Sequence, residues 1–110
     1  MSANEEILIH TSDLPLGEPV SSVGAMLARN RKKFGPNPAF AERASVAGDY
    51  VHRTWDELVN HVLRVHDHFN RAGLKPGDRV GFVSGNSYFR LIAELAAMSG
   101  GFVAVPVFAG

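Results

Sequence analysis

The sequence predicts an α/β fold, namely a partial parallel sheet with a βαβ unit, preceded by a β-hairpin and two helices. Two observations carry this prediction. In the last third of the chain, an apolar helical segment stands between two short segments that are apolar throughout, as buried parallel strands are. Before them, two segments with helical periodicity flank a pair of short extended segments.

The composition is that of a globular domain or part of one. Apolar residues make up 45% and charged residues 20% of the 110 positions, which argues against disorder. Eleven acidic and eleven basic side chains cancel, so no nucleic-acid partner is expected, because such binders usually carry a basic surplus. The lack of cysteine excludes disulfides, zinc thiolate sites and thiol nucleophiles, and it is compatible with a cytoplasmic location.

Residues 1–19 are predicted to form an irregular leader. They are acidic and include Pro15 and Pro19, the opposite of a secretory signal. A first helix is then predicted from about Ser21 to Phe34. Its start can be capped by Ser21 or Ser22, and Gly35-Pro36 stops it. Its apolar side chains recur with a helical period at Val20, Val23, Leu27 and Phe34.

Two extended segments follow, Ala39–Arg43 and Tyr50–Arg53. The residues between them, Ser45 to Asp49, are typical of a turn, so the pair is predicted to be a hairpin.

The second helix has the clearest signals in the chain. Thr54 and Glu57 have the spacing of a capping box, and Gly73 supplies a left-handed stop over which Leu74 can fold back. One apolar face is predicted from Leu58, Val62, Val65, Phe69 and Ala72.

The βαβ unit begins after a tight turn at residues 75–78. Its elements are a strand at Val80–Val83, a helix at Tyr88–Ser99 capped by Asn86 or Ser87, and a strand at Phe102–Val107. The buried stripe of this helix is predicted to be Leu91, Ile92, Leu95 and Met98. Although residues 91–110 carry a single charge, Gly100-Gly101 and Pro106 divide them, so no transmembrane segment is expected.

The sequence predicts no catalytic, cofactor-binding or metal-ligating residue. His61, His66 and His68 share the second helix but none are four apart, so zinc is not expected, and two of them should flank the apolar stripe and face water. The loop at residues 84–87 lies where phosphates bind in α/β folds, but it lacks both glycine-rich phosphate fingerprints, which favours a plain βα turn. Glu94 is expected on an exposed outer face, with a partner in a larger protein as the alternative.

The order of motifs from Val20 to Pro106 resembles the N-terminal segment of the adenylate-forming enzymes, the superfamily of acyl-CoA synthetases, luciferases and peptide-synthetase adenylation domains. The segments that carry the resemblance are Gly35-Pro36-Asn37-Pro38-Ala39-Phe40, Thr54-Trp55-Asp56-Glu57-Leu58, Gly73-Leu74-Lys75-Pro76-Gly77-Asp78-Arg79-Val80, Asn86-Ser87 and Gly100-Gly101-Phe102-Val103-Ala104-Val105-Pro106. These positions are scaffold in that family. Gly77-Asp78 makes the turn before a strand, where the aspartate is expected to bond to amides two residues on.

The resemblance implies an incomplete N-terminal subdomain of an AMP-binding domain at residues 20–110, from a fatty acyl-CoA synthetase that uses ATP, magnesium and coenzyme A. Such a piece would be inactive by itself and, because its last strand lacks neighbours, would self-associate through that exposed apolar strand. The expected location is cytoplasmic, with peripheral membrane contact kept open. The alternatives are a fatty-acyl-AMP ligase or another acid-adenylating enzyme and, in a different class, a stand-alone α/β binding or assembly module.

Overall fold

The computed structural model describes residues 13, 19–43 and 45–107. The predicted leader at residues 1–19 therefore lies outside the described residues, except for Asp13 and Pro19. The helices and strands of the described part are α1 (Val23–Phe34), β1 (Pro38–Arg43), β2 (Tyr50–Thr54), α2 (Trp55–Arg71), β3 (Arg79–Val83), α3 (Tyr88–Ser99) and β4 (Val103–Val107).

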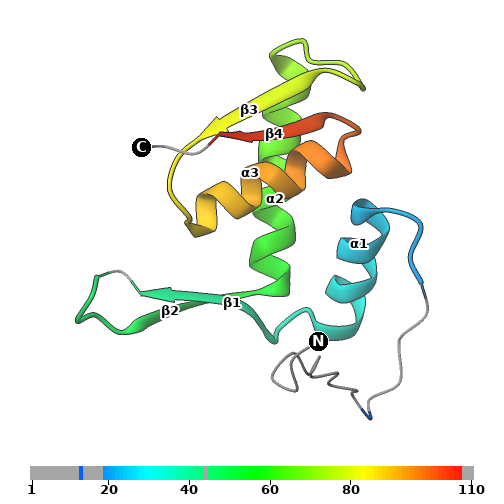
Figure 1. Cartoon of the computed structure of the whole chain (residues 1–110). Helices are drawn as coiled ribbons and strands as arrows, with labels where there is room; N and C mark the ends of the chain where they lie inside the picture. The colour runs from blue at the N-terminus through cyan, green and yellow to red at the C-terminus, as the bar shows by residue number, and fades with distance from the viewer. Residues whose placement is uncertain (1–12, 14–18, 44, 108–110) are drawn as a thin grey trace, which may run out of the picture.

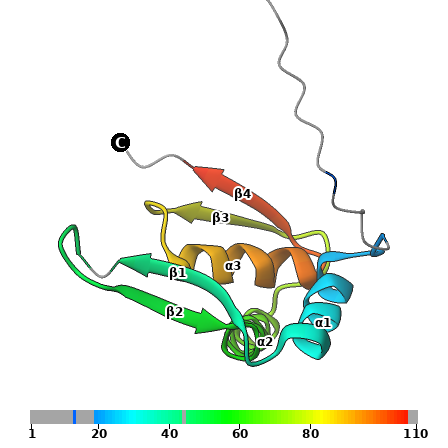
Figure 2. The same ribbon diagram turned by 90° about the horizontal axis from the view of Figure 1, so that it is seen from below.

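The elements form the βαβ unit and the hairpin that the sequence predicts. Strands β3 and β4 pair in parallel, with Val80 opposite Ala104, and β1 pairs with β2 in antiparallel fashion. Helix α3 connects β3 to β4 and lies between their sheet and a layer made of α2 and the hairpin (Figures 1 and 2). The mixed α/β fold class is thus confirmed.

Local capping fixes where the first two helices begin. The Ser22 hydroxyl accepts a hydrogen bond from the Ala25 amide at 3.0 Å, so α1 begins after Ser22. At α2 the Thr54 hydroxyl accepts from the Glu57 amide at 3.1 Å, and the Glu57 carboxylate accepts from the Thr54 amide at 3.3 Å. The predicted capping box is confirmed.

The end of α1 lies directly against the start of α2. Gly35 has a right-handed backbone conformation, and its carbonyl accepts a hydrogen bond from the Asp56 amide at 3.0 Å. A Cβ atom on Gly35 would lie 2.9 Å from the Arg31 carbonyl oxygen and 2.8 Å from the Asp56 carboxylate. A side chain at residue 35 would therefore force the backbone of α1 at Arg31 and the Asp56 side chain of α2 to shift.

Helices α2 and α3 end in the same way, with a glycine in the left-handed region followed by an apolar residue. At α2, Gly73 has φ 90°, and the Leu74 amide donates to the Phe69 carbonyl at 3.2 Å. At α3, Gly101 has φ 79°, and the Phe102 amide donates to the Ala97 carbonyl at 2.9 Å. Both are Schellman motifs, and the fold-back of Leu74 is confirmed.

The turn before β3 is hydrogen-bonded to the segment that leads into β4. The Asp78 carboxylate accepts a hydrogen bond from the Lys75 amide at 2.8 Å, three residues before it, so the expected bond to amides two residues on is wrong. The reason is that Gly77, at φ 91°, turns the chain back over Lys75. The Asp78 carbonyl accepts from Val103, and the Gly77 amide donates to Gly101 at 2.9 Å, which aligns the starts of the two strands.

Helix α3 is buried on two sides, and this changes its expected core stripe. Small side chains, Ala96 and Ala97, are fully buried, whereas Met98 is 43% exposed, so its predicted place in the core is wrong. Tyr88, Ile92 and Ala96 pack toward α2, and Ala97 packs toward Phe82 and Phe102 of the sheet side. Alanine is favoured on a helix held between two layers because it permits close approach. Ala72 was also expected in the core but lies exposed just after the last residue of α2.

One face of the parallel sheet is covered by α3, and no helix or strand of the described residues covers the other, which we call the bare face. Apolar side chains on the bare face are substantially exposed, namely Val83 at 70%, Val103 at 47%, Val105 at 38% and Val107 at 44%. No helix in the described part of the chain is both long enough and apolar enough to cross a membrane.

Candidate functional site

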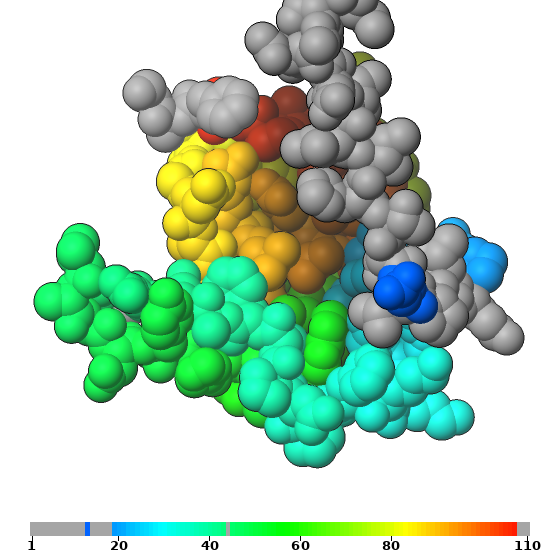
Figure 3. All heavy atoms as spheres, turned by 60° about the horizontal axis from the view of Figure 1, so that its bottom comes forward, coloured from blue at the N-terminus to red at the C-terminus, as the bar shows by residue number. Residues whose placement is uncertain are grey.

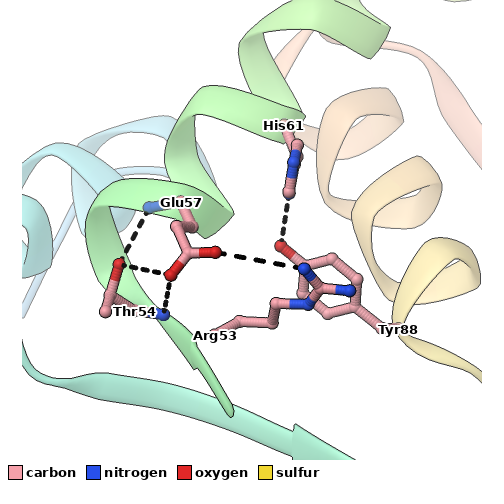
Figure 4. Close-up of polar contacts among 5 residues, drawn as sticks. All are labelled: Arg53, Thr54, Glu57, His61 and Tyr88. Atoms are coloured by element: carbon pink, nitrogen blue, oxygen red, sulfur yellow. Dashed lines mark hydrogen bonds and ion pairs between the residues drawn. The ribbon is translucent and has the colours of Figure 1, made fainter. Parts of the chain in front are cut away.

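The strongest concentration of polar and aromatic side chains surrounds Tyr88, the first residue of α3. Its side chain is fully buried, and its hydroxyl oxygen lies 2.7 Å from Nδ1 of His61 on α2 (Figure 4). The ring packs against Phe40 of β1 at 5.5 Å between centroids. The Arg53 guanidinium of β2 lies over the same ring, 4.9 Å from its centroid. Tyr88 therefore connects the hairpin, α2 and α3.

The capping box of α2 is part of the same cluster. One carboxylate oxygen of Glu57 accepts from Thr54, and the other lies 4.0 Å from the Arg53 guanidinium (Figure 4). Nε of Arg53 is buried and has no hydrogen-bond partner among the described residues. The arginine is thus held by the ring of Tyr88 and by Glu57, in a cation–π contact and a long ion pair.

Burial raises the pKa of the Tyr88 hydroxyl above its usual value. The Arg53 cation opposes this rise, while the Glu57 and Glu42 carboxylates add to it. At neutral pH the phenol therefore keeps its proton and acts as a hydrogen-bonding group. Because the Tyr88 side chain is fully buried, its hydroxyl bond to His61 joins α3 to α2.

The N-terminus of α3 already has an anionic partner within the protein. One oxygen of the Glu42 carboxylate, from β1, accepts a hydrogen bond from the Tyr88 amide at 3.0 Å. The Ser87 hydroxyl accepts from the Arg90 amide at 3.1 Å. A helix N-terminus attracts phosphate through free amides and its positive dipole end, and here the Tyr88 amide already donates to a carboxylate. The Glu42 carboxylate therefore occupies the Tyr88 amide at this helix end.

A pocket of about 250 Å³ lies beside this loop and contains a paired set of charges. Nε of Arg90 lies 2.9 Å from the Glu94 carboxylate, and the guanidinium also donates to the Ser84 carbonyl. The Glu94 side chain is 29% exposed, so the expectation of an open outer face is wrong. Its spacing of four from Arg90 explains this, because the two side chains meet on one face of α3.

The histidines of α2 have separate surroundings. His68 is exposed, whereas His61 lies against Tyr88 and the His66 ring packs on Phe102 at 6.2 Å between centroids. His68 thus faces water as expected, while His61 and His66 are half-buried because α3 and the segment leading into β4 cover part of that side of α2. No cluster of three His, Cys, Asp or Glu side chains that could hold a metal occurs within residues 19–43 and 45–107 or at residue 13.

Sequence reasoning did not find the Tyr88 cluster. Its contacts join residues far apart in the chain, 27 positions between His61 and Tyr88 and 46 between Glu42 and Tyr88. No spacing rule connects such positions. The available signal is an aromatic residue directly after the N-cap Ser87, where a polar or acidic side chain is more usual. The prediction that this chain holds no catalytic or cofactor-binding residue stays a prediction.

A protein-family model described as "AMP-binding enzyme" matches residues 27–110. No curated protein matches the chain. Among solved structures, the chain is similar to a fatty acid AMP ligase from Legionella pneumophila, with a TM-score of 0.68 and 21% identity over 80% of this chain and 15% of that one. It is also similar to a fatty acyl CoA synthetase from Mycobacterium tuberculosis, with a TM-score of 0.65 and 26% identity over 78% of this chain and 16% of that one.

A third similar structure is an acetoacetyl-CoA synthetase from Streptomyces lividans, with a TM-score of 0.72 and 23% identity over 79% of this chain and 13% of that one. This chain therefore spans less than a fifth of the length of each of these three structures. The likenesses at 21% and 23% identity show the shared fold.

Proposed function

The chain belongs to the AMP-binding enzyme family, and we propose that residues 20–110 form the N-terminal subdomain of an ATP-dependent fatty acyl-CoA synthetase. The family match over residues 27–110 is the observation that carries this proposal. The likeness to a fatty acyl CoA synthetase and to a fatty acid AMP ligase supports the choice of a fatty acid as substrate. The small share of those chains that is covered supports a longer parent protein.

The proposed parent reaction has two steps. A carboxylate oxygen of the fatty acid bonds to the α-phosphorus of ATP, and the bond to pyrophosphate breaks. The sulfur of coenzyme A then bonds to the acyl carbon, and the bond to AMP breaks as the thiol loses its proton. Magnesium, when bound, supplies positive charge next to the phosphate oxygens. The parent is expected to be cytoplasmic, with peripheral membrane contact as the alternative.

The described residues contribute structure to this enzyme. The Tyr88 cluster joins the hairpin to α2 and α3, and Glu42 occupies the helix end that a phosphate would otherwise take. We therefore place the binding of ATP, magnesium and coenzyme A on other residues of the parent. Residues 1–110 alone should show no ATP–pyrophosphate exchange above a blank. A measurable exchange rate that depends on a fatty acid would contradict this assignment.

The substrate class is tested on the full-length protein. Hydroxamate formation with fatty, aryl and amino acids separates a fatty-acid enzyme from other acid-adenylating enzymes. Release of acyl-CoA then separates a synthetase from a fatty-acyl-AMP ligase, which would stop at acyl-AMP. Activity with aryl or amino acids alone, or acyl-AMP without acyl-CoA, would overturn the proposed substrate or the proposed acceptor.

The reading frame beyond codon 110 tests the proposed parent directly. The proposal expects an open frame that continues into the rest of an AMP-binding domain. A stop codon after Gly110, together with a monomeric chain that melts cooperatively, would favour a stand-alone α/β binding or assembly module instead.

A further inference from the structure

A groove of about 570 Å³ runs between α1 and α2, and none of the residues of the Tyr88 cluster line it. Figure 1 shows the two helices side by side, and Figure 3 shows α1 on the opposite side of the molecule from the projecting hairpin. The floor of the groove is apolar, because Leu27, Val59 and Val62 line it and each is less than a tenth exposed. Its volume lies within the range of small-molecule sites in proteins, which is about 300–1,000 Å³.

The apolar part of the lining is aliphatic. The residues that α1 contributes lie three or four apart and so share one helix face, namely Gly24, Leu27, Ala28, Arg31 and Lys32. The wall on α2 includes Leu63, which is 54% exposed. No aromatic side chain of the described residues lines the groove, so it offers no stacking surface to a planar ring. The apolar group that fits such a lining is an alkyl chain.

The two ends of the groove differ in charge. One end lies at Gly24 and Ser99, where α1 begins and α3 ends, and carries no charge. The Ser99 hydroxyl already donates to a backbone carbonyl of its own helix at 3.2 Å. The other end is lined by Arg31, Lys32 and Asp56. Polar recognition of a ligand is therefore concentrated at this second end.

The charged end has an excess of one positive charge. Nε of Arg31 lies 3.4 Å from the Asp56 carboxylate, while Lys32 is exposed and has no ion pair within the described residues. From Gly24 to Lys32, α1 rises by about 12 Å. A ligand that lies along the groove and matches both ends therefore has an anionic group at one end of a medium-length alkyl chain.

We propose that the groove between α1 and α2 binds an aliphatic carboxylate, with the alkyl chain over Leu27, Val59 and Val62 and the carboxylate paired with Lys32. Burial of the chain supplies most of the attraction, because an exposed ion pair contributes little. The proposal concerns binding and involves no chemical step. It does not rest on the proposed enzymatic function, because residues 1–110 would bind the carboxylate whether or not the parent adenylates fatty acids.

Decanoate is the probe, added to the full chain below its micelle concentration and followed through the amide signals in nitrogen-15 spectra. The signals that move should belong to residues 24–32 and 59–63, and the change should saturate at one decanoate per chain. For so small a ligand in an open groove, the Kd should be on the order of 1 mM. Acetate, which lacks the chain, should cause no saturable change. Decyltrimethylammonium, which keeps the chain but carries a cation, should bind about fivefold more weakly.

Three substitutions test the charged end. Lys32→Glu should raise the Kd for decanoate by about two- to fivefold at low salt, the range of exposed ion pairs. Lys33→Glu is the matched control, because Lys33 is the next residue of α1, is exposed and does not line the groove. It makes the same change in net charge and should leave the Kd close to that of the wild type. Asp56→Asn should lower the Kd by up to about fivefold, because it releases Arg31 for the carboxylate.

Two further substitutions test the alkyl chain. Leu63→Ser removes part of the apolar wall at an exposed residue, so the chain should still fold and the Kd should rise by about threefold. Val105→Lys changes the bare face of the parallel sheet and should leave the Kd unchanged.

Several outcomes would overturn the proposal. One is the absence of a saturable change with decanoate, and another is a set of moving signals that lies on the bare face of the sheet. Equal binding of decyltrimethylammonium, an equal loss in Lys32→Glu and Lys33→Glu, or no gain in Asp56→Asn would each exclude the proposed pairing. Signals of residues 24–32 and 59–63 that move with protein concentration in the absence of decanoate would mean that a second copy of the chain occupies the groove.

Discussion

Replacing Tyr88 by phenylalanine removes one hydroxyl from a fully buried ring and keeps the contacts of the ring. The substitution deletes the 2.7 Å hydrogen bond to His61 and leaves Phe40 and Arg53 in place. No cavity larger than an oxygen atom results. The change in stability therefore reports on that hydrogen bond.

The magnitude follows from what each partner loses. A hydrogen bond of this kind contributes about 0.5–1.5 kcal/mol net, because the unfolded chain bonds to water instead. His61 is half-buried, so water can reach its free Nδ1 and only a small further penalty arises. We expect Tyr88→Phe to lower the free energy of unfolding by about 1 kcal/mol, or the melting temperature by about 5 °C.

Urea unfolding, followed by the fluorescence of the single tryptophan at position 55 and by circular dichroism, measures this change. Tyr50→Phe is the matched control, because Tyr50 is 55% exposed and contacts Arg43 through its ring alone. Combining Tyr88→Phe with His61→Ala completes a double-mutant cycle, in which a coupling of about 1 kcal/mol is expected. A loss no larger than that of Tyr50→Phe, or a coupling near zero, would refute the reasoning.

Four further predictions follow from the same structure. The pKa of Tyr88 is higher in the folded than in the unfolded chain, so its contribution to the free energy of unfolding is complete below the unfolded pKa of about 10 and is lost as pH rises through the folded pKa. The urea midpoint should therefore fall between pH 8 and pH 11, and this fall should be smaller in Tyr88→Phe. Thr54→Ala removes the capping hydroxyl of α2 and should cost about 1 kcal/mol, whereas Thr54→Ser should cost much less; thermal melts measure both. Gly73→Ala places a side chain at φ 90° and should cost about 1–2 kcal/mol, while Gly85→Ala, where a Cβ meets open space, should be close to neutral in the same melts. Wild-type protein should elute as a self-associated species in size-exclusion chromatography, and Val105→Lys on the bare sheet face should shift it toward the monomer; a monomeric wild type would contradict this.

The helices and strands could be predicted because their ends depend on neighbours in the sequence. Thr54 and Glu57 satisfy each other's backbone amides three residues apart, and Gly73 ends its helix through its own backbone conformation. The hairpin and the βαβ unit follow from the order of such elements. These features need no knowledge of what lies across the core.

The buried faces could be predicted only in part. Leu58 and Val62 are buried as expected, but the stripe of α3 depends on two layers that approach it from different sides. A single apolar stripe cannot represent a helix covered on both faces, which is why Met98 was assigned to the core and Ala96 was not. The cluster around Tyr88 could not be predicted from the sequence either, because its partners come from three separate elements.

The position of Glu42 has the largest consequence for function. Sequence motifs alone favour a plain turn at residues 84–87 because phosphate fingerprints are missing, which is an argument from absence. In the structure, the Glu42 carboxylate accepts a hydrogen bond from the Tyr88 amide at the N-terminus of α3, which also favours a plain turn here. A phosphate placed there would have to displace that carboxylate and would be repelled by it at close range. This bond supports our proposal that the parent binds phosphate elsewhere, and it holds the hairpin against α3 at this end of the sheet.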